Sequence, residues 1–357
     1  MILLGSTGSI GVNALLIAQR FNLNVDILVA GRNITLLNQQ IQQFSPRRVV
    51  VLNPEDISSV NHPSVTAGEE AILQAIEQSN STVVVNALVG FAGFRPTLKA
   101  LECGKKVALA NKESLVVGGA FVDTSRIIPI DSEHFGLWYL NQTPRAVSRM
   151  LVTASGGAFR DWEIALIEKA TLSDALKHPN WSMGQKITID SASMMNKLFE
   201  LLEARWLFGE GEYDAIIETR SLIHALIDYK DGSTTAHFAN ADMKLPIAYA
   251  LMGKVDEPVL ERVDLVRAGG LEFRAIESDR YPIWELKGDV LANPTRGVIL
   301  NAANEIAIER FVNNEISFGA LSRLVLDVYD HFQYAPNSLD DVFALNDEVR
   351  QYAKNHR

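Results

Sequence analysis

The sequence predicts an α/β protein in three parts: an N-terminal doubly wound, Rossmann-like domain, a central α/β catalytic domain and a small C-terminal helical domain. Three observations support this prediction. Strand-like and helical segments alternate up to residue 131, strands recur between residues 149 and 239, and the pattern beyond residue 294 is helical. We expect the parts to span 1–131, 132–256 and 295–357, with 257–294 as a linking arm.

The composition excludes several classes of protein. The chain has 357 residues, 47% of them hydrophobic, and a net charge of −10, so nothing in the charge supports a nucleic-acid partner. Cys103 is the only cysteine, which excludes an intramolecular disulfide and suits a reducing compartment. No apolar run reaches the roughly 18 residues of a membrane span, and no signal peptide precedes the first motif. We therefore expect a soluble cytoplasmic protein without a membrane partner.

The first motif is a glycine-rich loop. The apolar residues 1–4 lead into Gly5-Ser6-Thr7-Gly8-Ser9-Ile10-Gly11, which is followed by a helical pattern over 13–21 and a strand over 25–30. Glycines in a strand–loop–helix unit allow a tight turn, and the helix N-terminus can then meet a pyrophosphate. The complete βαβ context favours a dinucleotide site over a merely structural turn.

The second strand predicts which dinucleotide binds. It ends in Gly31-Arg32-Asn33 without an acidic residue, and Asp26 lies at its opposite end. An acid at the tip favours the ribose 2′-hydroxyl of NAD, whereas an arginine favours the 2′-phosphate of NADP. Arg32 therefore predicts NADP(H), although a solvated surface arginine is the alternative.

The alternation continues to the end of the first part. Runs at 48–52 and 82–87 are typical of buried strands, and 69–78 and 95–102 are typical of helices. A strand at 106–110 delivers Asn111-Lys112-Glu113-Ser114 at its carboxyl end, where ligands bind in open α/β sheets. Capping of the next helix explains Asn111 and Glu113 equally well.

Two carboxylates end the next apolar run, 127–130. If that run is a strand that continues through Glu133, Asp131 and Glu133 point to the same side. A hard divalent cation such as Mg²⁺ or Mn²⁺ would relieve their repulsion, because such ions prefer oxygen ligands. For this pattern alone, a solvated strand end is the commoner explanation.

The middle of the chain has features of an anion site and a lid. A strand at 149–154 enters Ser155-Gly156-Gly157, whose amides and hydroxyl could hold an anion. The loop Lys177–Gly184 carries Trp181 and Met183 between a proline and a glycine, which favours a lid over a buried core segment.

A helix continuing to residue 208 follows the predicted lid. Asn196, Lys197 and Glu200 share one of its faces. On this spacing alone, a solvent-exposed salt bridge of little energetic value is the favoured explanation.

The remaining segments complete the second and third parts. Strands are expected at 213–218, 221–229 and 234–239, with a hairpin at Asp231-Gly232 and a candidate dimer surface on this sheet. His224 and His237 alternate with apolar residues, as core or interface histidines do. The linking arm contains one strand, and the C-terminal part contains three helices; these elements are expected at 271–276, 298–312, 320–332 and 338–353, the last with Ser338 and Asp341 as a capping box.

Together these motifs resemble the 1-deoxy-D-xylulose 5-phosphate reductoisomerases, NADPH-dependent enzymes of the non-mevalonate isoprenoid pathway. The resemblance covers nearly the whole chain. Its motifs, in order, are GSTGSIG, AGRN, NALVGFAG, ALANKES, PIDSEH, ASGGAFRD, KHPNWSMG, TIDSASMMNK, EARWLF, ADMKLPIAYAL and NAANEIA.

The resemblance implies a reaction and a set of site residues. The reaction is rearrangement of 1-deoxy-D-xylulose 5-phosphate, a 2-keto sugar phosphate, and its reduction by NADPH to 2-C-methyl-D-erythritol 4-phosphate, in a homodimer with Mg²⁺ or Mn²⁺. The implied metal ligands are Asp131, Glu133 and Glu200, and the implied catalytic residues are these three with Lys112 and His178. The implied substrate contacts are Lys112, Ser132, Glu133, Ser155, His178, Trp181, Ser191, Asn196, Lys197 and Glu200, of which Ser155, Ser191, Asn196 and Lys197 would hold the phosphate. The implied NADPH contacts are Thr7, Gly8, Ser9, Ile10, Gly31, Arg32, Asn33, Asn111, Glu113 and Gly184.

The chain departs from the family pattern at three places, of which the smallest is Ala158, in place of a common proline after the glycine pair. The family pattern N-K-G-L-E is replaced by Asn196-Lys197-Leu198-Phe199-Glu200, which keeps the spacing from lysine to glutamate. The pattern I-H-P-Q-S is replaced by Ile217-Glu218-Thr219-Arg220-Ser221, which puts a role for that histidine or glutamine in doubt.

Two other functions stay open at this stage. A semialdehyde dehydrogenase shares the glycine loop, but it needs a nucleophilic cysteine, and Cys103 has no histidine near it in the sequence. A non-enzymatic NADP sensor would leave the carboxylates and the predicted lid unexplained.

Overall fold

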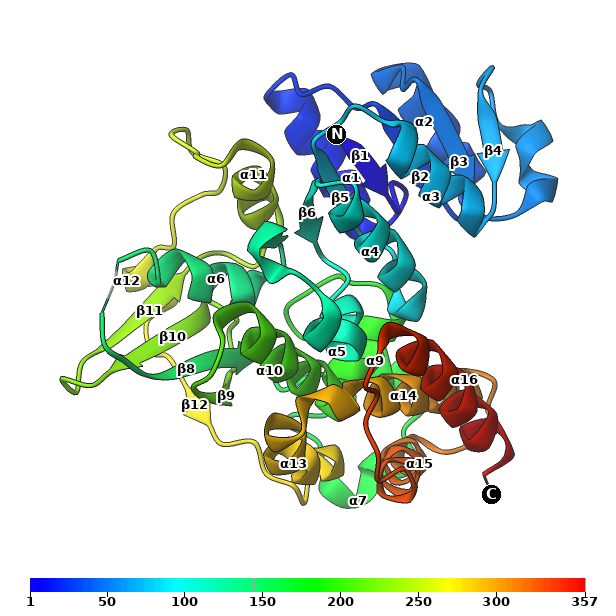
Figure 1. Cartoon of the computed structure of the whole chain (residues 1–357). Coiled ribbons are helices and arrows are strands. Elements are labelled where there is room, and N and C mark those ends of the chain that lie inside the picture. The colour runs from blue at the N-terminus through cyan, green and yellow to red at the C-terminus, as the bar shows by residue number, and fades with distance from the viewer. Residues whose placement is uncertain (144, 357) are drawn as a thin grey trace. The chain divides into compact units, whose positions relative to one another are not determined.

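The computed structural model describes residues 1–143 and 145–356, which form two compact units (Figure 1). The first unit contains Met1–Asn111, Asp123–Asp131 and Asp242–Leu260. The second contains Lys112–Val122, Ser132–Ala241 and the chain from Glu261 onward. The domain boundaries expected from the sequence divide the chain differently and stay a prediction. The difference at 242–256 arises because helix α11 (Lys244–Met252) packs against helix α1 (Ser9–Arg20) of the first unit.

The first unit is built on a parallel sheet of seven strands in the order β4-β3-β2-β1-β5-β6-β7. The strands are β1 (Ile2–Leu4), β2 (Ile27–Ala30), β3 (Arg48–Val51), β4 (Val65–Ala67), β5 (Val83–Asn86), β6 (Lys106–Leu109) and β7 (Ile127–Pro129). The central strand β1 is buried and pairs Leu3 with Leu28 and Val85. Continuous apolar runs are what a parallel sheet covered on both faces requires.

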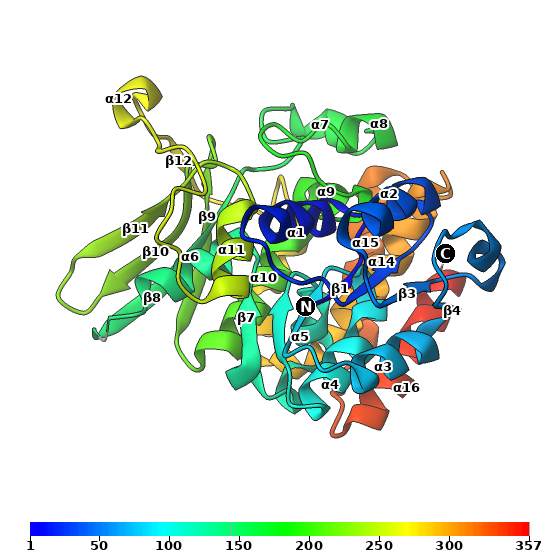
Figure 2. The same cartoon turned by 90° about the horizontal axis from the view of Figure 1, so that it is seen from above.

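Helices cover both faces of this sheet, as the alternating pattern predicts. They are α1, α2 (Ile34–Phe44), α3 (Glu69–Gln78), α4 (Phe94–Glu102) and α11. Figure 2 shows α1 and α2 on one face and α3 and α4 on the other. Because the strands are parallel, their carboxyl ends lie at one edge of the sheet.

The second unit contains a mixed sheet of five strands in the order β11-β10-β8-β9-β12. The strands are β8 (Val147–Ala154), β9 (Glu212–Glu218), β10 (Ile223–Tyr229), β11 (Thr234–Phe238) and β12 (Phe273–Arg274). Strand β8 is parallel to β9 and antiparallel to β10, and β10 and β11 form the predicted hairpin. Helix α6 (Ser132–Leu140) packs on the β8, β10 and β11 strands (Figure 2). Gly136 permits this approach, since a Cβ there would lie 2.8 Å from that of Ala225.

The other helices of the second unit lie around this sheet and in a C-terminal bundle. They are α5 (Glu113–Gly118), α7 (Ile164–Ile167), α8 (Leu172–Ala175), α9 (Gln185–Ser193), α10 (Met195–Phe208), α12 (Leu265–Ala268), α13 (Lys287–Ala292), α14 (Gly297–Val312), α15 (Phe318–His331) and α16 (Leu339–Asn355). Helix α14 packs against α15, α16 and α5 (Figure 1). It is buried along most of its length. The α/β class with a C-terminal helical region is therefore confirmed.

Short 3-10 segments connect several of these elements, at Pro54–Ser59, Gly90–Gly93, Gly119–Phe121, Thr124–Arg126, Pro282–Leu286 and Pro294–Arg296. The predicted capping box on the last helix is only half formed. Ser338 Oγ accepts from the backbone N–H of Asp341, whereas Asp341 Oδ2 accepts from the N–H of Asn337. Across residues 1–143 and 145–356, no helix has both the length and the apolar character needed to cross a membrane.

Candidate active site

The glycine loop joins β1 to α1 at the carboxyl edge of the parallel sheet. Gly5 has φ +83°, and a Cβ on it would lie 2.5 Å from the carbonyl oxygen of Ala87. A Cβ on Gly11 would lie 2.2 Å from the carbonyl oxygen of Gly5, so both positions require glycine. Gly8 is exposed and begins α1 without a side-chain cap. Thr7, Gly8, Ser9 and Ile10 thus form the approach to a helix N-terminus, where an anion is favoured.

The carboxyl end of β2 lies at the same edge of the sheet and presents a positive charge. Arg32 is exposed, and Asn33 accepts the N–H of Leu36 at 3.1 Å, which caps α2. Asp26 precedes β2 and binds Arg47 at 3.0 Å and Ser79 at 2.5 Å. Asp26 is therefore engaged at the amino edge of the sheet, away from Arg32, and the contact of Arg32 with a 2′-phosphate stays a prediction.

Asn111 has a structural task that sequence reasoning missed. Its Nδ2 donates to the carbonyl oxygens of Leu88 and Gly90, both at 2.9 Å. A Cβ on Gly93 would lie 2.3 Å from Asn111 Oδ1, so the glycine makes room for the amide. Asn111 therefore shapes the loop after β5 as well as ending β6.

The prediction that Asp131 and Glu133 lie on one strand is wrong, although the two carboxylates do come together. Strand β7 ends at Pro129 and α6 begins at Ser132, so Glu133 lies in the first turn of a helix. An acidic residue is favourable there, because backbone N–H groups are exposed at a helix N-terminus. Asp131, Glu133 and Glu200 each offer a carboxylate oxygen, and these oxygens lie within 4.8 Å of one another.

Glu200 belongs to α10, which the sequence predicts to be continuous with the preceding helix. The structure instead breaks the chain at Met194, whose φ is +71°, between α9 and α10. Helix α10 therefore begins anew at Met195, with Asn196 and Lys197 in its first turn and Glu200 in its second. The break turns these three side chains toward one point.

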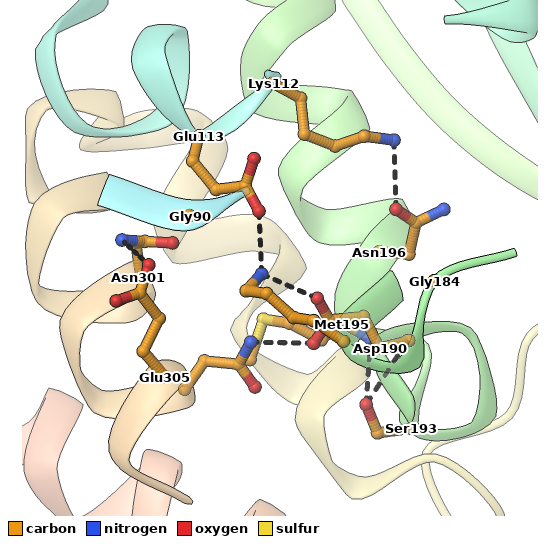
Figure 3. Close-up of polar contacts among 12 residues, drawn as sticks. Gly90, Lys112, Glu113, Gly184, Asp190, Ser193, Met195, Asn196, Asn301 and Glu305 are labelled. Atoms are coloured by element: carbon orange, nitrogen blue, oxygen red, sulfur yellow. Dashed lines mark hydrogen bonds and ion pairs between the residues drawn. The ribbon is translucent and has the colours of Figure 1, made fainter. Parts of the chain in front are cut away.

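These side chains form a buried ionic cluster with Lys112 and Glu133. Lys112 Nζ donates to Asn196 Oδ1 and Glu200 Oε1, both at 2.9 Å, and Figure 3 shows the contact with Asn196. Lys197 Nζ donates to Glu133 Oε1 at 2.8 Å and to Glu200 Oε2 at 2.5 Å. The side chains of Lys197 and Glu200 are only 7% and 1% exposed, so the expectation of a solvated pair is wrong. Burial on this scale requires that each charge be compensated.

The donor set of this cluster fits a hard divalent cation. Asp131, Glu133 and Glu200 supply oxygens only, the ligand type preferred by Mg²⁺ and Mn²⁺. A second group of possible ligands combines Asp131 with His134 and Glu203. The ring of His134 is engaged on both sides, with Nε2 2.8 Å from the carbonyl oxygen of Glu200 and Nδ1 3.3 Å from Glu203 Oε2. The group of three carboxylates is therefore the better candidate for a metal site. His134 instead contacts Glu200 and Glu203 and so stabilises α10.

Ser155 and His178 form a second polar group in this unit. Ser155 Oγ accepts the N–H of Gly157 at 3.0 Å and lies 2.8 Å from His178 Nε2. His178 Nδ1 accepts the N–H groups of Asn180 and Trp181, at 3.2 and 2.9 Å. Nδ1 is thus an acceptor, and Nε2 carries the proton that His178 donates to Ser155. Burial lowers the pKa of His178 to about 4, with the charges of Lys197 and Arg160 adding to the effect.

The loop 155–157, called the phosphate loop below after its predicted role, also contacts helix α9. Gly157 has φ +67°, and a Cβ on it would lie 2.4 Å from the carbonyl oxygen of Ser191. Ser155 and Ser191, both predicted to hold the phosphate, therefore come from neighbouring backbone segments. Trp181 is half-buried and meets His224 edge-on at 6.0 Å, and Gly184 begins α9. His224 and His237 are both buried, as expected for core histidines.

A buried network links Glu113 to α9 and α14 (Figure 3). Lys186 Nζ donates to Glu113 Oε1 and Asp190 Oδ2, both at 2.8 Å, and Asn304 Nδ2 donates to Asp190 Oδ1 at 2.7 Å. Burial opposes the charge on Lys186, but Asp190 and Glu113 outweigh it and raise the pKa of Lys186. Lys186, Asp190 and Asn304 were missed as site residues, and the i,i+4 spacing of Lys186 and Asp190 was the available signal.

Cys103 does not have the setting of a catalytic nucleophile. It follows α4 and precedes β6, at the amino edge of the parallel sheet, whereas the glycine loop lies at the carboxyl edge. The position argues against a cysteine-dependent dehydrogenase.

Three family models match the chain. Residues 1–119 match 1-deoxy-D-xylulose 5-phosphate reductoisomerase, residues 127–208 its C-terminal domain, and residues 238–352 a further DXP reductoisomerase C-terminal domain. Among curated proteins, the 1-deoxy-D-xylulose 5-phosphate reductoisomerases of Nautilia profundicola and Wolinella succinogenes are 55% and 52% identical to this chain. The first alignment covers 100% of both chains and the second 99% of both.

Solved structures agree with these sequence matches. A DOX-P reductoisomerase in complex with NADPH, fosmidomycin and magnesium is 30% identical, with a TM-score of 0.89 over 99% of this chain and 96% of its own. The Zymomonas mobilis 1-deoxy-D-xylulose 5-phosphate reductoisomerase in complex with NADPH is 33% identical, with a TM-score of 0.88 over 99% and 97%. This chain belongs to the 1-deoxy-D-xylulose 5-phosphate reductoisomerase family.

Proposed function

We propose that this protein converts 1-deoxy-D-xylulose 5-phosphate to 2-C-methyl-D-erythritol 4-phosphate, with NADPH as the reductant and a divalent cation as a cofactor. The observation that carries the proposal is the convergence of three carboxylates, those of Asp131, Glu133 and Glu200, beside the ammonium groups of Lys112 and Lys197. Buried charged groups that cluster in this way are typical of functional sites. Binding of a cation together with a keto sugar phosphate would explain why these charges are buried here.

NADPH is proposed to bind at the carboxyl edge of the parallel sheet. The backbone of Thr7, Gly8, Ser9 and Ile10 would meet the pyrophosphate, and Arg32 with Gly31 and Asn33 would meet the 2′-phosphate. The exposed arginine and the distant position of Asp26 support NADPH over NADH. Two solved relatives contain NADPH, which adds support. Asn111, Glu113 and Gly184 are proposed as further contacts.

Asp131, Glu133 and Glu200 are proposed to hold the Mg²⁺ or Mn²⁺ ion. When bound, such an ion supplies Lewis acidity toward neighbouring substrate oxygens. Ser132, which donates to Glu133 at 2.5 Å, holds one of the ligand carboxylates in place and is also a proposed substrate contact. Lys112 would place positive charge near the developing oxyanion.

The phosphate is proposed to bind Ser155, Ser191, Asn196 and Lys197. Lys197 belongs to the buried charged cluster, where its ammonium group donates to Glu200. A local ammonium group of this kind supports anion binding in a protein without a basic surface. His178, on the same loop as Trp181, would hold the substrate and join the lid to the phosphate loop. Closure of this lid would exclude water, with the phosphate supplying binding energy for it.

We further propose a homodimer that uses the exposed side of the five-stranded sheet, and a cytoplasmic location. Sedimentation of the purified protein tests the first proposal: a mass near 39 kDa would contradict it.

The deciding experiment is NADPH oxidation with 1-deoxy-D-xylulose 5-phosphate, with and without Mg²⁺ or Mn²⁺. Oxidation that depends on both the sugar phosphate and the cation supports the reaction, the cofactor and the carboxylate site together. Folded protein that binds NADPH but does not oxidise it would instead favour an NADP sensor.

A further inference from the structure

The connection between β9 and β10 crosses the end of the strand that carries the phosphate loop. Strands β9 and β10 are not neighbours, because β8 lies between them in the sheet. The chain leaves β9 at Glu218, passes over residues 219–222 and enters β10 at Ile223. Since β8 runs parallel to β9, its carboxyl end, which leads into Ser155, lies directly beneath this crossing.

One buried carboxylate organises the crossing. Glu218 is 0% exposed, and its carboxylate accepts the backbone N–H groups of Arg220 at 2.9 Å, Leu222 at 2.7 Å and Ile223 at 3.2 Å. The backbone carbonyl of Glu218 accepts the fourth N–H group, that of Ser221, at 3.3 Å. Ser221 is held at φ +53°, a conformation that non-glycine residues rarely adopt. Charge-assisted bonds to three amides stabilise a turn that the sequence alone would not favour.

The crossing then supplies acceptors to the lid. Asn180 Nδ2, from the predicted lid, donates to the carbonyl oxygen of Thr219 at 3.0 Å and to Ser221 Oγ at 2.8 Å. The backbone N–H of the same Asn180 donates to Nδ1 of His178. The lid segment is therefore fastened to the crossing through one amide side chain, two residues from its histidine.

The crossing also holds the phosphate loop. Arg160 Nη1 donates to the carbonyl oxygens of Thr219 and Ser155, both at 2.8 Å. The same side chain covers Gly156, where a Cβ would lie 2.6 Å from Arg160 Cδ. Arg160 thus ties the first residue of the phosphate loop to the turn that Glu218 organises.

We propose that Glu218 is a positioning residue for the sugar-phosphate site, acting through the 219–222 crossing on Asn180 of the lid and Arg160 of the phosphate loop. Glu218 stands in the segment 217–221, which reads I-E-T-R-S where the family resemblance leads us to expect I-H-P-Q-S. In this chain the Glu218 carboxylate accepts the backbone N–H groups that the crossing exposes. The inference rests on the proposed function only for the identity of the phosphate ligands.

The test compares Glu218→Gln with wild type and with Glu212→Gln, which removes an exposed carboxylate at the other end of the same strand. Glutamine fills the same space, but its NH₂ group opposes the backbone N–H donors. We expect the KM for 1-deoxy-D-xylulose 5-phosphate to rise at least about tenfold in Glu218→Gln, with the KM for NADPH unchanged. We also expect faster amide hydrogen exchange in residues 176–184. Glu212→Gln should match wild type in all three measurements.

A purely structural role for Glu218 gives a different result. It would lower the unfolding temperature while leaving the substrate KM and the exchange of the lid unchanged, and that outcome overturns the proposal. Asn180→Ala provides an independent test, because Asn180 is partly exposed and its loss leaves the turn itself intact. It should raise the same KM, and the double variant Asn180→Ala/Glu218→Gln should fall short of the product of the single effects. An unchanged KM in Asn180→Ala, or fully multiplicative effects, also overturns the proposal.

Failure of the proposed phosphate site can be told apart from failure of this inference. Ser155→Ala removes a proposed ligand directly. If Ser155→Ala leaves the substrate KM unchanged, the phosphate site is wrong. If Ser155→Ala raises the KM and Glu218→Gln does not, only the role of Glu218 is wrong.

Discussion

Lys197 Nζ lies 2.5 Å from Glu200 Oε2, one helical turn further along α10, in a setting where both side chains are almost fully buried. The same ammonium group binds Glu133. Lys197 therefore compensates part of the charge on two of the three proposed metal ligands, and Lys112 adds a second positive charge beside Glu200. Lys197, which is proposed to hold the substrate phosphate, is thus also an ion-pair partner of two proposed metal ligands.

Lys197→Met should make the protein's stability depend on the metal. Loss of the ammonium leaves the carboxylates of Glu133 and Glu200 under-compensated, so we expect the unfolding midpoint in EDTA to fall by about 5 °C or more. Mg²⁺ should restore much of this loss, because it binds the folded state. Differential scanning fluorimetry with EDTA and with Mg²⁺ measures both, and Lys254→Met, at an 80% exposed side chain, is the control. Equal losses in the two buffers would contradict the prediction.

Glu200→Gln should separate catalysis from cofactor binding. The substitution keeps the shape of the side chain but removes the charge that three donors share, namely Lys112, Asn196 and Lys197. We expect turnover to fall by at least about a hundredfold while the Kd for NADPH, measured by fluorescence titration, stays unchanged. Glu210→Gln removes a carboxylate that is 93% exposed and should behave as wild type. Near-normal turnover of Glu200→Gln at saturating Mg²⁺ would refute the assignment.

Arg32→Ala should weaken the preference for NADPH over NADH. Removing the guanidinium takes away the proposed partner of the 2′-phosphate, so the KM for NADPH should rise about tenfold or more, with little change for NADH. Steady-state kinetics with each cofactor give the ratio. Lys106→Ala removes an exposed positive charge at the amino edge of the same sheet and should leave the ratio as it is. A similar rise for both cofactors would mean that Arg32 does not read the 2′-phosphate.

The Ser155–His178 pair should contribute stability above pH 6.5 and lose it on acidification. Burial lowers the pKa of His178 from 6.5 to about 4, so the unfolded chain binds the proton more tightly than the folded chain. Between these values, protonation favours unfolding. We expect about 1–2 kcal/mol of the stability to be lost between pH 6.5 and pH 4, after allowing for solvent screening of the partly exposed ring.

Urea unfolding of wild type and His178→Gln at several pH values tests this expectation. His237, whose pKa burial also lowers to about 4, titrates in both proteins and cancels in the difference. The difference in unfolding free energy should shrink toward pH 4. A difference that is constant with pH would show that His178 is not held neutral.

Lys186→Met should destabilise the whole second unit. The substitution leaves the carboxylates of Glu113 and Asp190 buried without their shared cation, which typically costs about 3–5 kcal/mol. Urea unfolding measures the loss, and Lys177→Met, at a 68% exposed lysine, should cost almost nothing. Adding Asp190→Asn to Lys186→Met should recover part of the loss. No recovery would mean that the unpaired charge is not the cause.

The sequence predicts best what short segments determine on their own. The apolar runs of β3 and β5, the helix Glu69–Gln78 and the Asp231-Gly232 hairpin all follow from local patterns and form as expected. Helix α6 was missed because Asp131 and Glu133 fit a strand end and a helix start equally well. The break at Met194, whose φ is +71°, was missed because methionine is a good helix former and gives no signal for such a break.

In the candidate site, too, local sequence patterns predict some features and tertiary packing determines the others. The resemblance places the proposed ligands in the sequence, and the structure brings Lys112, Glu133, Asn196, Lys197 and Glu200 into one cluster. Partners that lie far apart in the chain have no local signal. Asn304 meets Asp190 across 114 positions, and the contact depends on how α14 packs. Burial also reverses the interpretation of Lys197 and Glu200, because spacing alone cannot tell a solvated pair from a desolvated one.

The arrangement around Ser155 has a consequence for what the site can accept. Its oxygen already receives two hydrogens, one from Gly157 and one from the ring of His178, so only the hydroxyl hydrogen is left to offer. The Ser155 hydroxyl can therefore donate a hydrogen bond to a ligand but has little capacity left to accept one. A ligand group that accepts hydrogen bonds suits this position, whereas a group that must donate one would not find a free acceptor on Ser155.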